Sequence, residues 1–220
     1  MAASPSSRTD PSATDVLVTI VPDQGDPAAD HRMLAALARQ LTPLPDDTTI
    51  THHCDACGSA EHGRPQLSAH GTEPVPPVHL SLSRAAGHVA LAATLAGPIG
   101  IDIESPSAVR TAGFDDVAFD AGERAALKVR AEAHGPPAAD RMRTLAWAAK
   151  EAVLKAAGTG LRADPRTVLL DLTRDEDPAM RTGSPRLVVL SEAPAEVLGC
   201  LAVVAYAPPR IRFVTAPRTR

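Results

Sequence analysis

The feature that most constrains the fold is an alternation of apolar and polar residues across residues 78–104. Apolar side chains occupy every second position in three short segments, 78–82, 89–95 and 99–103, and Ala86-Gly87 marks a turn between the first two. A period of two is typical of strands that bury one face, and short connections favour antiparallel neighbours. This region therefore predicts three short strands arranged as a meander.

Helix and strand patterns alternate along the rest of the chain. Apolar residues spaced by three and four predict helices over 30–41, 120–133 and 139–157. Pro136-Pro137 is expected to break the second helix, and Gly158 to cap the third. Further strands are expected at 16–21, 167–173, 185–190, 198–206 and 211–215, and residues 42–77 are expected to be a long irregular stretch.

Composition excludes several classes of protein. Hydrophobic residues make up 44% of the 220 residues but aromatics only 2%, so the core must be built from Ala, Val, Leu and Ile. A net charge of −4 gives no basic field for a nucleic-acid partner. No stretch approaches the length of an apolar membrane span, and three cysteines do not make a disulfide framework. We expect a cytoplasmic protein with a disordered leader at residues 1–14.

Two acids lie on one side of the last alternating strand. In Gly100-Ile101-Asp102-Ile103-Glu104, residues two apart point to the same face, so Asp102 and Glu104 share a face and the isoleucines share the other. Two carboxylates this close repel each other unless a cation lies between them, and hard divalent cations favour such oxygen ligands. The alternative is an edge strand with a solvated polar face.

The helix at 139–157 carries a second group of charges. Trp147, Glu151 and Lys155 follow one another at intervals of four residues and therefore line one side of this helix, close to Lys150. Glu151 would add a third carboxylate, and the lysines would neutralise phosphate. The alternative is a solvent-facing helix with one Glu–Lys pair, worth only a few tenths of a kcal/mol.

These two pieces together resemble the signature of the 4′-phosphopantetheinyl transferases. The match consists of Gly-Ile-Asp-Ile-Glu at 100–104 and Trp-x-x-Lys-Glu-Ala-x-x-Lys-x-x-Gly-x-Gly-Leu at 147–161. His62-Gly63-Arg64-Pro65 is similar to the family's Gly-Lys/Arg-Pro loop, and Asp30-His31-Arg32 to its N-terminal phosphate-contacting segment. The resemblance covers roughly residues 30–161, and the length is similar to that of the two-lobed, surfactin-synthetase-activating type.

The resemblance implies an α+β fold of two pseudo-symmetric lobes, each a small sheet packed on a helix, with a ligand cleft between them. The N-terminal lobe would span 15–104 and the C-terminal lobe 105–220, working as one unit and as a monomer. The implied activity is that of a holo-[acyl-carrier-protein] synthase. The phosphopantetheine arm of coenzyme A is transferred to a serine of an apo acyl or peptidyl carrier protein of fatty acid, polyketide or nonribosomal peptide synthesis, and 3′,5′-ADP leaves.

The resemblance also assigns roles to residues. Asp102, Glu104 and Glu151 would hold Mg²⁺ against the coenzyme A diphosphate. Glu151 would take the serine proton, and Lys155 would stabilise the transferred phosphoryl group. The coenzyme A contacts implied by the motifs are Arg32, Arg64, Pro65, Ser81, Lys150 and Lys155. Leu82 departs from the family, because many members have a histidine there that binds the 3′-phosphate, which leaves His79, Arg32 or Arg64 to carry more of that contact.

A cysteine–histidine segment precedes the Gly-Arg-Pro loop. Cys54, Cys57 and His62 have residue types and spacing that suit a structural Zn²⁺ site, although no second Cys-x-x-Cys pair follows. The alternative is a pair of reduced cysteines on a loop. Two other functions stay open at this point: a zinc-stabilised, non-enzymatic binding module, and a different magnesium-dependent phosphotransferase, for which no Walker-type phosphate loop is present.

Overall fold

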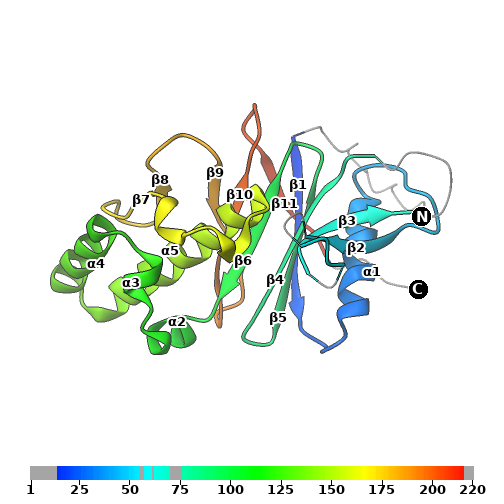
Figure 1. Cartoon of the computed structure of the whole chain (residues 1–220). Helices are drawn as coiled ribbons and strands as arrows, with labels where there is room; N and C mark the ends of the chain where they lie inside the picture. The colour runs from blue at the N-terminus through cyan, green and yellow to red at the C-terminus, as the bar shows by residue number, and fades with distance from the viewer. Residues whose placement is uncertain (1–13, 55–56, 61, 70–75, 216–220) are drawn as a thin grey trace, which may run out of the picture.

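Two larger sheets and two small hairpins make up the strands of the computed structural model (Figure 1). It describes residues 14–54, 57–60, 62–69 and 76–215. The four-stranded sheet has the order β11 (Arg210–Phe213), β1 (Asp15–Pro22), β5 (His88–Thr94), β4 (His79–Ala85). The three-stranded sheet has the order β6 (Ile99–Glu104), β10 (Leu198–Val203), β9 (Arg186–Val189). The hairpins pair β2 (Thr49–His53) with β3 (Arg64–Ser68), and β7 (Leu170–Asp171) with β8 (Ala179–Met180).

Each longer helix begins where the local sequence supports a start. The helices are α1 (Pro27–Ala38), α2 (Pro106–Ala112), α3 (Asp115–Ala118), α4 (Ala121–His134) and α5 (Pro136–Ala157), with short 3₁₀ turns η1 (Gly160–Arg162) and η2 (Pro165–Thr167). The Asp26 side chain caps α1, and Asp120 forms a capping box with Glu123 at α4. Pro136 lies in the first turn of α5, where proline's missing N–H costs nothing.

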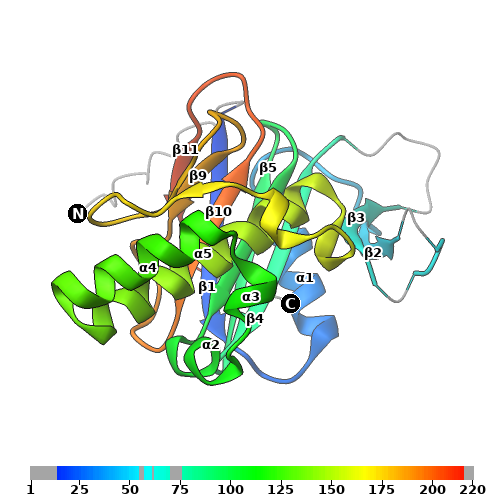
Figure 2. The same ribbon diagram turned by 60° about the vertical axis from the view of Figure 1, so that its left-hand side comes forward.

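The layers follow one another in the order α1, four-stranded sheet, three-stranded sheet, α5 (Figures 1 and 2). One apolar cluster lies between α1 and the first sheet, with Leu34 and Leu37 against Leu17 and Leu91. A second cluster lies between the two sheets, and a third joins the second sheet to α4 and α5. The α+β class expected from the sequence is confirmed, with each large sheet packed on a helix.

Two serines of β4 connect the two sheets. Strand β6 lies beside β4 without a backbone ladder, because the ladder partner of β6 is β10. The hydroxyl of Ser81 accepts a hydrogen bond from the Ile101 amide at 3.0 Å, and the Ser83 hydroxyl donates to the Asp102 carboxylate at 2.7 Å. These side chains take the place of the missing ladder bonds.

The expected meander is wrong in its third strand. Strands β4 and β5 pair as a hairpin, but β6 turns into the other sheet and pairs antiparallel with β10. The physical reason is that β6 is buried on both faces, with its isoleucines in the core between the sheets and Gly100 against α5. Strand periodicity identifies a buried face but not the neighbouring strand.

Other elements also differ from the expected ones. The stretch 42–77, expected to be irregular, contains the β2–β3 hairpin, and the strand expected at 167–173 shrinks to two residues. Helices α2 and α3 were not expected. Strand β11 returns to pair parallel with β1, so sheet membership does not follow the expected division at residue 104. Residues 1–13 of the expected leader lie outside the described residues.

No helix in the described ranges combines the length and apolarity that crossing a membrane requires.

Candidate active site

Strand β6 and helix α5 bring the predicted acids together. Asp102 and Glu104 lie on β6, and Glu151 and Lys155 on α5. The two elements approach closely at Gly100, where a Cβ atom would lie 1.9 Å from the Ala152 carbonyl oxygen. Any side chain at residue 100 would therefore force α5 away from β6 and separate the charges that the two elements carry.

Lys155 supplies the positive charge of this cluster. Its ammonium donates to the Asp102 carboxylate at 2.5 Å and to the Ile101 carbonyl oxygen at 3.2 Å, and it lies 4.0 Å from a Glu151 oxygen. The Lys155 side chain is 28% exposed, so one side of it stays open to an incoming group. The lysine therefore connects buried carboxylates with solvent.

Asp102 is the most buried of the three acids. One carboxylate oxygen accepts from Lys155 and Ser83, while the other oxygen is buried and has no hydrogen-bond partner. Burial raises the pKa of Asp102, although Lys155 and Ser83 oppose that shift. A buried carboxylate oxygen without a partner costs free energy, and a cation would satisfy it.

Glu104 and Glu151 are also difficult to ionise, because Lys155 does not fully compensate their charge. Burial, followed by repulsion from Asp102, raises the pKa of both Glu104 and Glu151 to about 7. The Trp147 indole N–H donates to Glu104 at 3.0 Å, which fixes that side chain but adds no charge. Three carboxylates next to one lysine form an oxygen-rich site of the kind that hard divalent cations prefer.

The three acids nevertheless do not converge on one ion position: Asp102 and Glu151 lie next to Lys155, whereas Glu104 is held by Trp147. Within the described ranges, ligand atoms all lying within 4.8 Å of one another occur at Cys54, Cys57 and His62 and not at the three acids. The donor types and the unpartnered Asp102 oxygen fit Mg²⁺.

A cavity of about 540 Å³ opens beside the cluster. Lys155 and Arg64 line it, together with Pro65, Ser81 and Leu82 from β3 and β4. The rest of the lining comes from the segment between β2 and β3 and from residues 158–162 after α5, so both halves of the chain contribute. Four of the predicted coenzyme A residues, Arg64, Pro65, Ser81 and Lys155, thus meet at one cavity.

Arg64 is held in place by the end of α5. Its guanidinium donates to the Ala156 carbonyl oxygen at 2.8 Å and lies against Gly158. A Cβ atom on Gly158 would lie 2.6 Å from that guanidinium, and the φ of Gly158 is +75°. The glycine of the motif therefore ends the helix and also leaves room for Arg64 beside the cavity.

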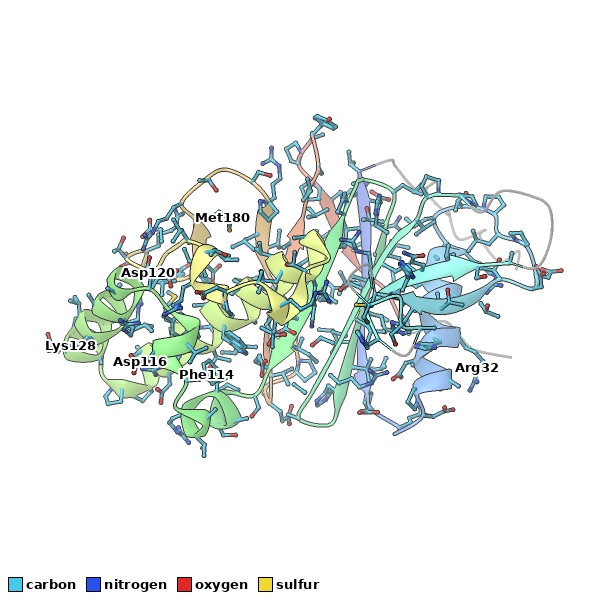
Figure 3. All side chains as sticks on the ribbon, viewed as in Figure 1. Arg32, Phe114, Asp116, Asp120, Lys128 and Met180 are labelled. Carbon is cyan, nitrogen blue, oxygen red and sulfur yellow. The ribbon has the colours of Figure 1, made fainter. Side chains whose placement is uncertain are left out.

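Two predicted residues lie elsewhere. Arg32 is on α1, where it does not line the cavity and pairs with Asp26 at 3.2 Å, and Figure 3 shows it projecting outward from that helix. Lys150 is fully buried on the other side of α5, where its ammonium lies 2.9 Å from Glu123 and donates to two backbone carbonyl oxygens. Lys150 therefore connects α5 to α4 and to residues 165–168, and it does not reach the cavity.

Sequence reasoning missed Ser83 and the role of Trp147. Ser83 positions Asp102, and Trp147 positions Glu104 while its ring packs on Phe114 at 4.7 Å. The sequence does indicate that Ser83 belongs to the site, because it lies two residues after Ser81 and therefore on the same face of the strand.

Comparison with known families bears directly on β6 and α5. Residues 98–197 match the 4′-phosphopantetheinyl transferase superfamily. The matched range contains Asp102, Glu104, Glu151 and Lys155, and it covers a little under half of the 220 residues. No curated protein matched the chain. The superfamily resemblance is thus confirmed for a domain at 98–197, whereas the two-lobed, surfactin-synthetase-activating type was not tested.

Proposed function

We propose that this protein is a 4′-phosphopantetheinyl transferase of the two-lobed type. It would transfer the 4′-phosphopantetheine arm of coenzyme A to a serine of an apo acyl or peptidyl carrier protein. The observation that carries the proposal is the junction of one buried and two half-buried carboxylates with Lys155, at the edge of a cavity that Arg64 also lines. The three acids and Lys155 lie inside the range that matches the superfamily, whereas Arg64 lies outside it.

The cavity suits the phosphorylated end of coenzyme A. Arg64 and Lys155 place two cationic groups along it, and guanidinium and ammonium groups bind phosphate oxygens strongly. In the proposed complex Arg64 contacts the 3′-phosphate, and Lys155 turns from Asp102 toward the diphosphate. Leu82 lines the same cavity, so the position where many relatives have histidine contributes only apolar surface here.

Asp102, Glu104 and Glu151 would hold Mg²⁺. When bound, the ion would neutralise charge on the diphosphate and relieve the repulsion among the three carboxylates. The structure offers two kinds of donor for this role: the unpartnered Asp102 oxygen, and the two glutamates whose pKa is raised to about 7 by burial and neighbouring negative charge.

Transfer would proceed by attack of the carrier serine hydroxyl on the phosphorus of the diphosphate that bears the pantetheine. A new oxygen–phosphorus bond forms, and the bond from that phosphorus to the leaving oxygen of 3′,5′-ADP breaks. Glu151, directly or through a water, takes the serine proton, and Lys155 donates to the phosphoryl oxygens as negative charge develops.

The test is to weigh the carrier. The protein is incubated with coenzyme A, Mg²⁺ and a panel of apo acyl and peptidyl carriers, and each carrier is analysed by intact mass. A gain of one phosphopantetheine arm on the serine is expected, and Glu151→Gln should lower the rate by at least about 100-fold. If no carrier gains mass while coenzyme A binds, the chain is a binding module and not a transferase.

A further inference from the structure

The segment between β2 and β3 gathers three metal-ligating side chains beside the cavity. The sulfur atoms of Cys54 and Cys57 and a ring nitrogen of His62 all lie within 4.8 Å of one another. Cys57 sulfur lies 3.4 Å from His62 Nε2. Tetrahedral zinc with bonds of about 2.3 Å to sulfur and 2.0 Å to nitrogen sets these ligands about 3.5–3.8 Å apart. We propose that Cys54, Cys57 and His62 bind one zinc ion.

The backbone of the segment holds this arrangement without the ion. The Gly58 amide donates to the Cys54 carbonyl oxygen at 2.8 Å, which closes the turn that brings the two cysteines together. The Cys54 amide donates to the Ser59 carbonyl oxygen at 3.0 Å. Gly58 has a φ of +71°, a conformation that suits glycine directly after the second cysteine. The ligands are therefore pre-positioned, which lowers the entropy cost of binding a metal.

A cationic side chain lies next to one of the two sulfur atoms. Arg162 of η1 donates to the Cys54 sulfur at 3.4 Å. A zinc-bound thiolate carries negative charge, which a neighbouring guanidinium stabilises. Cys200 differs from Cys54, because it is fully buried in β10 and burial raises the pKa of its thiol.

The site also links the two sides of the cavity. Cys54, Cys57 and His62 line the cavity, and Arg162 joins Cys54 to the segment that follows α5. Gly63 and Arg64 follow His62 directly, and a Cβ on Gly63 would lie 2.2 Å from the His53 carbonyl oxygen. Zinc would thus fix the loop that presents Arg64. This consequence for coenzyme A rests on the proposed function, whereas zinc binding itself does not.

Zinc content of the whole purified chain is the primary test. We expect about one zinc per chain by elemental analysis, and less than about 0.2 for Cys54→Ser, Cys57→Ser and His62→Ala. Cys200→Ala and His134→Ala remove the same groups elsewhere and should keep full zinc. Replacement by Co²⁺ should give the absorption of thiolate-to-cobalt charge transfer, and that absorption should vanish in Cys57→Ser. Full zinc in the three ligand variants would overturn the proposal.

Stability gives a second, activity-free readout. Stripping the protein with a zinc chelator should lower Tm by about 5–10 °C relative to protein with zinc at about 100 times its Kd. Zinc should restore Tm and Mg²⁺ should not. Isolation of a metal-free chain with a Cys54–Cys57 disulfide, two mass units lighter and indifferent to zinc, would contradict the site.

The effect on coenzyme A separates the two proposals. Zinc removal should weaken coenzyme A binding by about 3–10-fold, as expected for a loop that loses its pre-organisation. A chain that binds stoichiometric zinc but modifies no carrier would contradict the proposed function and leave the zinc site standing. A chain that modifies carriers equally well with and without zinc, and contains none as purified, would contradict the zinc site alone.

Discussion

Glu104 illustrates how function and stability oppose each other at single residues of this site. Its pKa is raised to about 7, first by burial and then by repulsion from Asp102 and Glu151. A carboxylate that is costly to ionise in the folded chain destabilises the chain when it is charged, unless a cation compensates it. The ionised Glu104 carboxylate is also the form that would bind a cation held by the diphosphate. The residues that hold the metal should therefore destabilise the protein when the metal is absent.

Glu104→Gln is therefore expected to stabilise the metal-free protein and to lower transfer. The glutamine carbonyl oxygen can still accept the Trp147 hydrogen bond, so only the charge is removed. In EDTA at pH 8 we expect Tm to rise by about 2–4 °C, and transfer at saturating Mg²⁺ to fall by at least about tenfold. Differential scanning calorimetry and the carrier mass assay measure the two effects.

The control for this variant is Glu132→Gln, which removes a charge from the exposed face of α4. It should change neither quantity. A Glu104→Gln protein with unchanged Tm and normal turnover would show that Glu104 neither repels its neighbours nor serves the reaction.

Arg64 and Arg32 make a matched pair for recognition of the 3′-phosphate. The sequence pointed to both, but only Arg64 lines the cavity. Charged hydrogen bonds of this kind are worth about 1.5–3 kcal/mol. We expect Arg64→Gln to raise KM for coenzyme A by about 10–100-fold and to affect dephospho-coenzyme A much less.

Arg32→Ala should leave KM for both substrates nearly unchanged, because Arg32 is exposed and pairs with Asp26. Steady-state kinetics with the two substrates decide the matter. Equal loss with both substrates in Arg64→Gln would remove its 3′-phosphate role and leave only its contact with Ala156.

Helix α5 shows, at the scale of an element, what a spacing argument can and cannot decide. An interval of four residues correctly placed Glu151 and Lys155 on the face toward β6. Lys150 precedes Glu151 directly and therefore points elsewhere, toward Glu123 of α4. The motif could not reveal this, because the partner lies 27 residues earlier and belongs to the capping box of α4. Local periodicity assigns a face to each residue, whereas packing decides what covers that face.

Lys150→Met should therefore destabilise the fold rather than weaken coenzyme A binding. It leaves Glu123 buried and without its cation, which typically costs 3–5 kcal/mol, so a loss of about 3 kcal/mol or more is expected. The double variant Lys150→Met/Glu123→Gln should recover part of this loss, because the uncompensated charge is gone. Urea denaturation of Lys150→Met, Glu123→Gln, the double variant and the parent chain completes the cycle.

If Lys150→Met lowers the affinity for coenzyme A without lowering the stability, Lys150 contacts the substrate, as the family motif implied.

The contact between α1 and the β2–β3 hairpin predicts a pH effect. His31 of α1 lies with its Nε2 3.1 Å from Nε2 of His52, whose other nitrogen faces the Gly63 carbonyl oxygen at 3.1 Å. Burial, followed by electrostatic repulsion from the neighbouring His52 and Arg84, lowers the pKa of His31 below its usual 6.5. The folded chain then binds fewer protons than the unfolded chain, so this contact loses stability as pH falls below about 6.5.

His31→Gln should reduce that loss. Between pH 8 and pH 5.5, Tm of the parent chain should fall by about 2 °C more than Tm of the variant. Glu104 and Glu151 have raised pKa values and act in the opposite direction in both proteins, so the difference isolates His31. His134→Gln on the exposed end of α4 is the control. An identical pH dependence in parent and His31→Gln would contradict the effect.

The whole molecule depends on pairings that no local pattern contains. Most strands and helices could be predicted from the sequence, because burial periods are local properties. The α+β class and the meeting of Asp102 with Glu151 were implied by the family resemblance and not by periodicity. The sequence did not predict that β6 pairs with β10, or that β11 crosses back to β1. Both pairings join residues about one hundred or more positions apart, and many apolar edges would accept the same strand.

Strand β11 is the strongest test of that long-range organisation. Arg212 pairs at 3.0 Å with Asp15, which is 1% exposed, and Phe213 and Ile211 pack against the core between the two sheets. Deletion of residues 207–220 would leave Asp15 buried without its cation and the edge of β1 unpaired. We expect Tm to fall by at least about 8 °C and the truncated chain to aggregate, as measured by calorimetry and size-exclusion chromatography. Deletion of residues 216–220 alone keeps β11 and should behave like the full chain. A 207–220 deletion that stays soluble with the parental Tm would show that the parallel pairing of β11 with β1 contributes nothing to the fold.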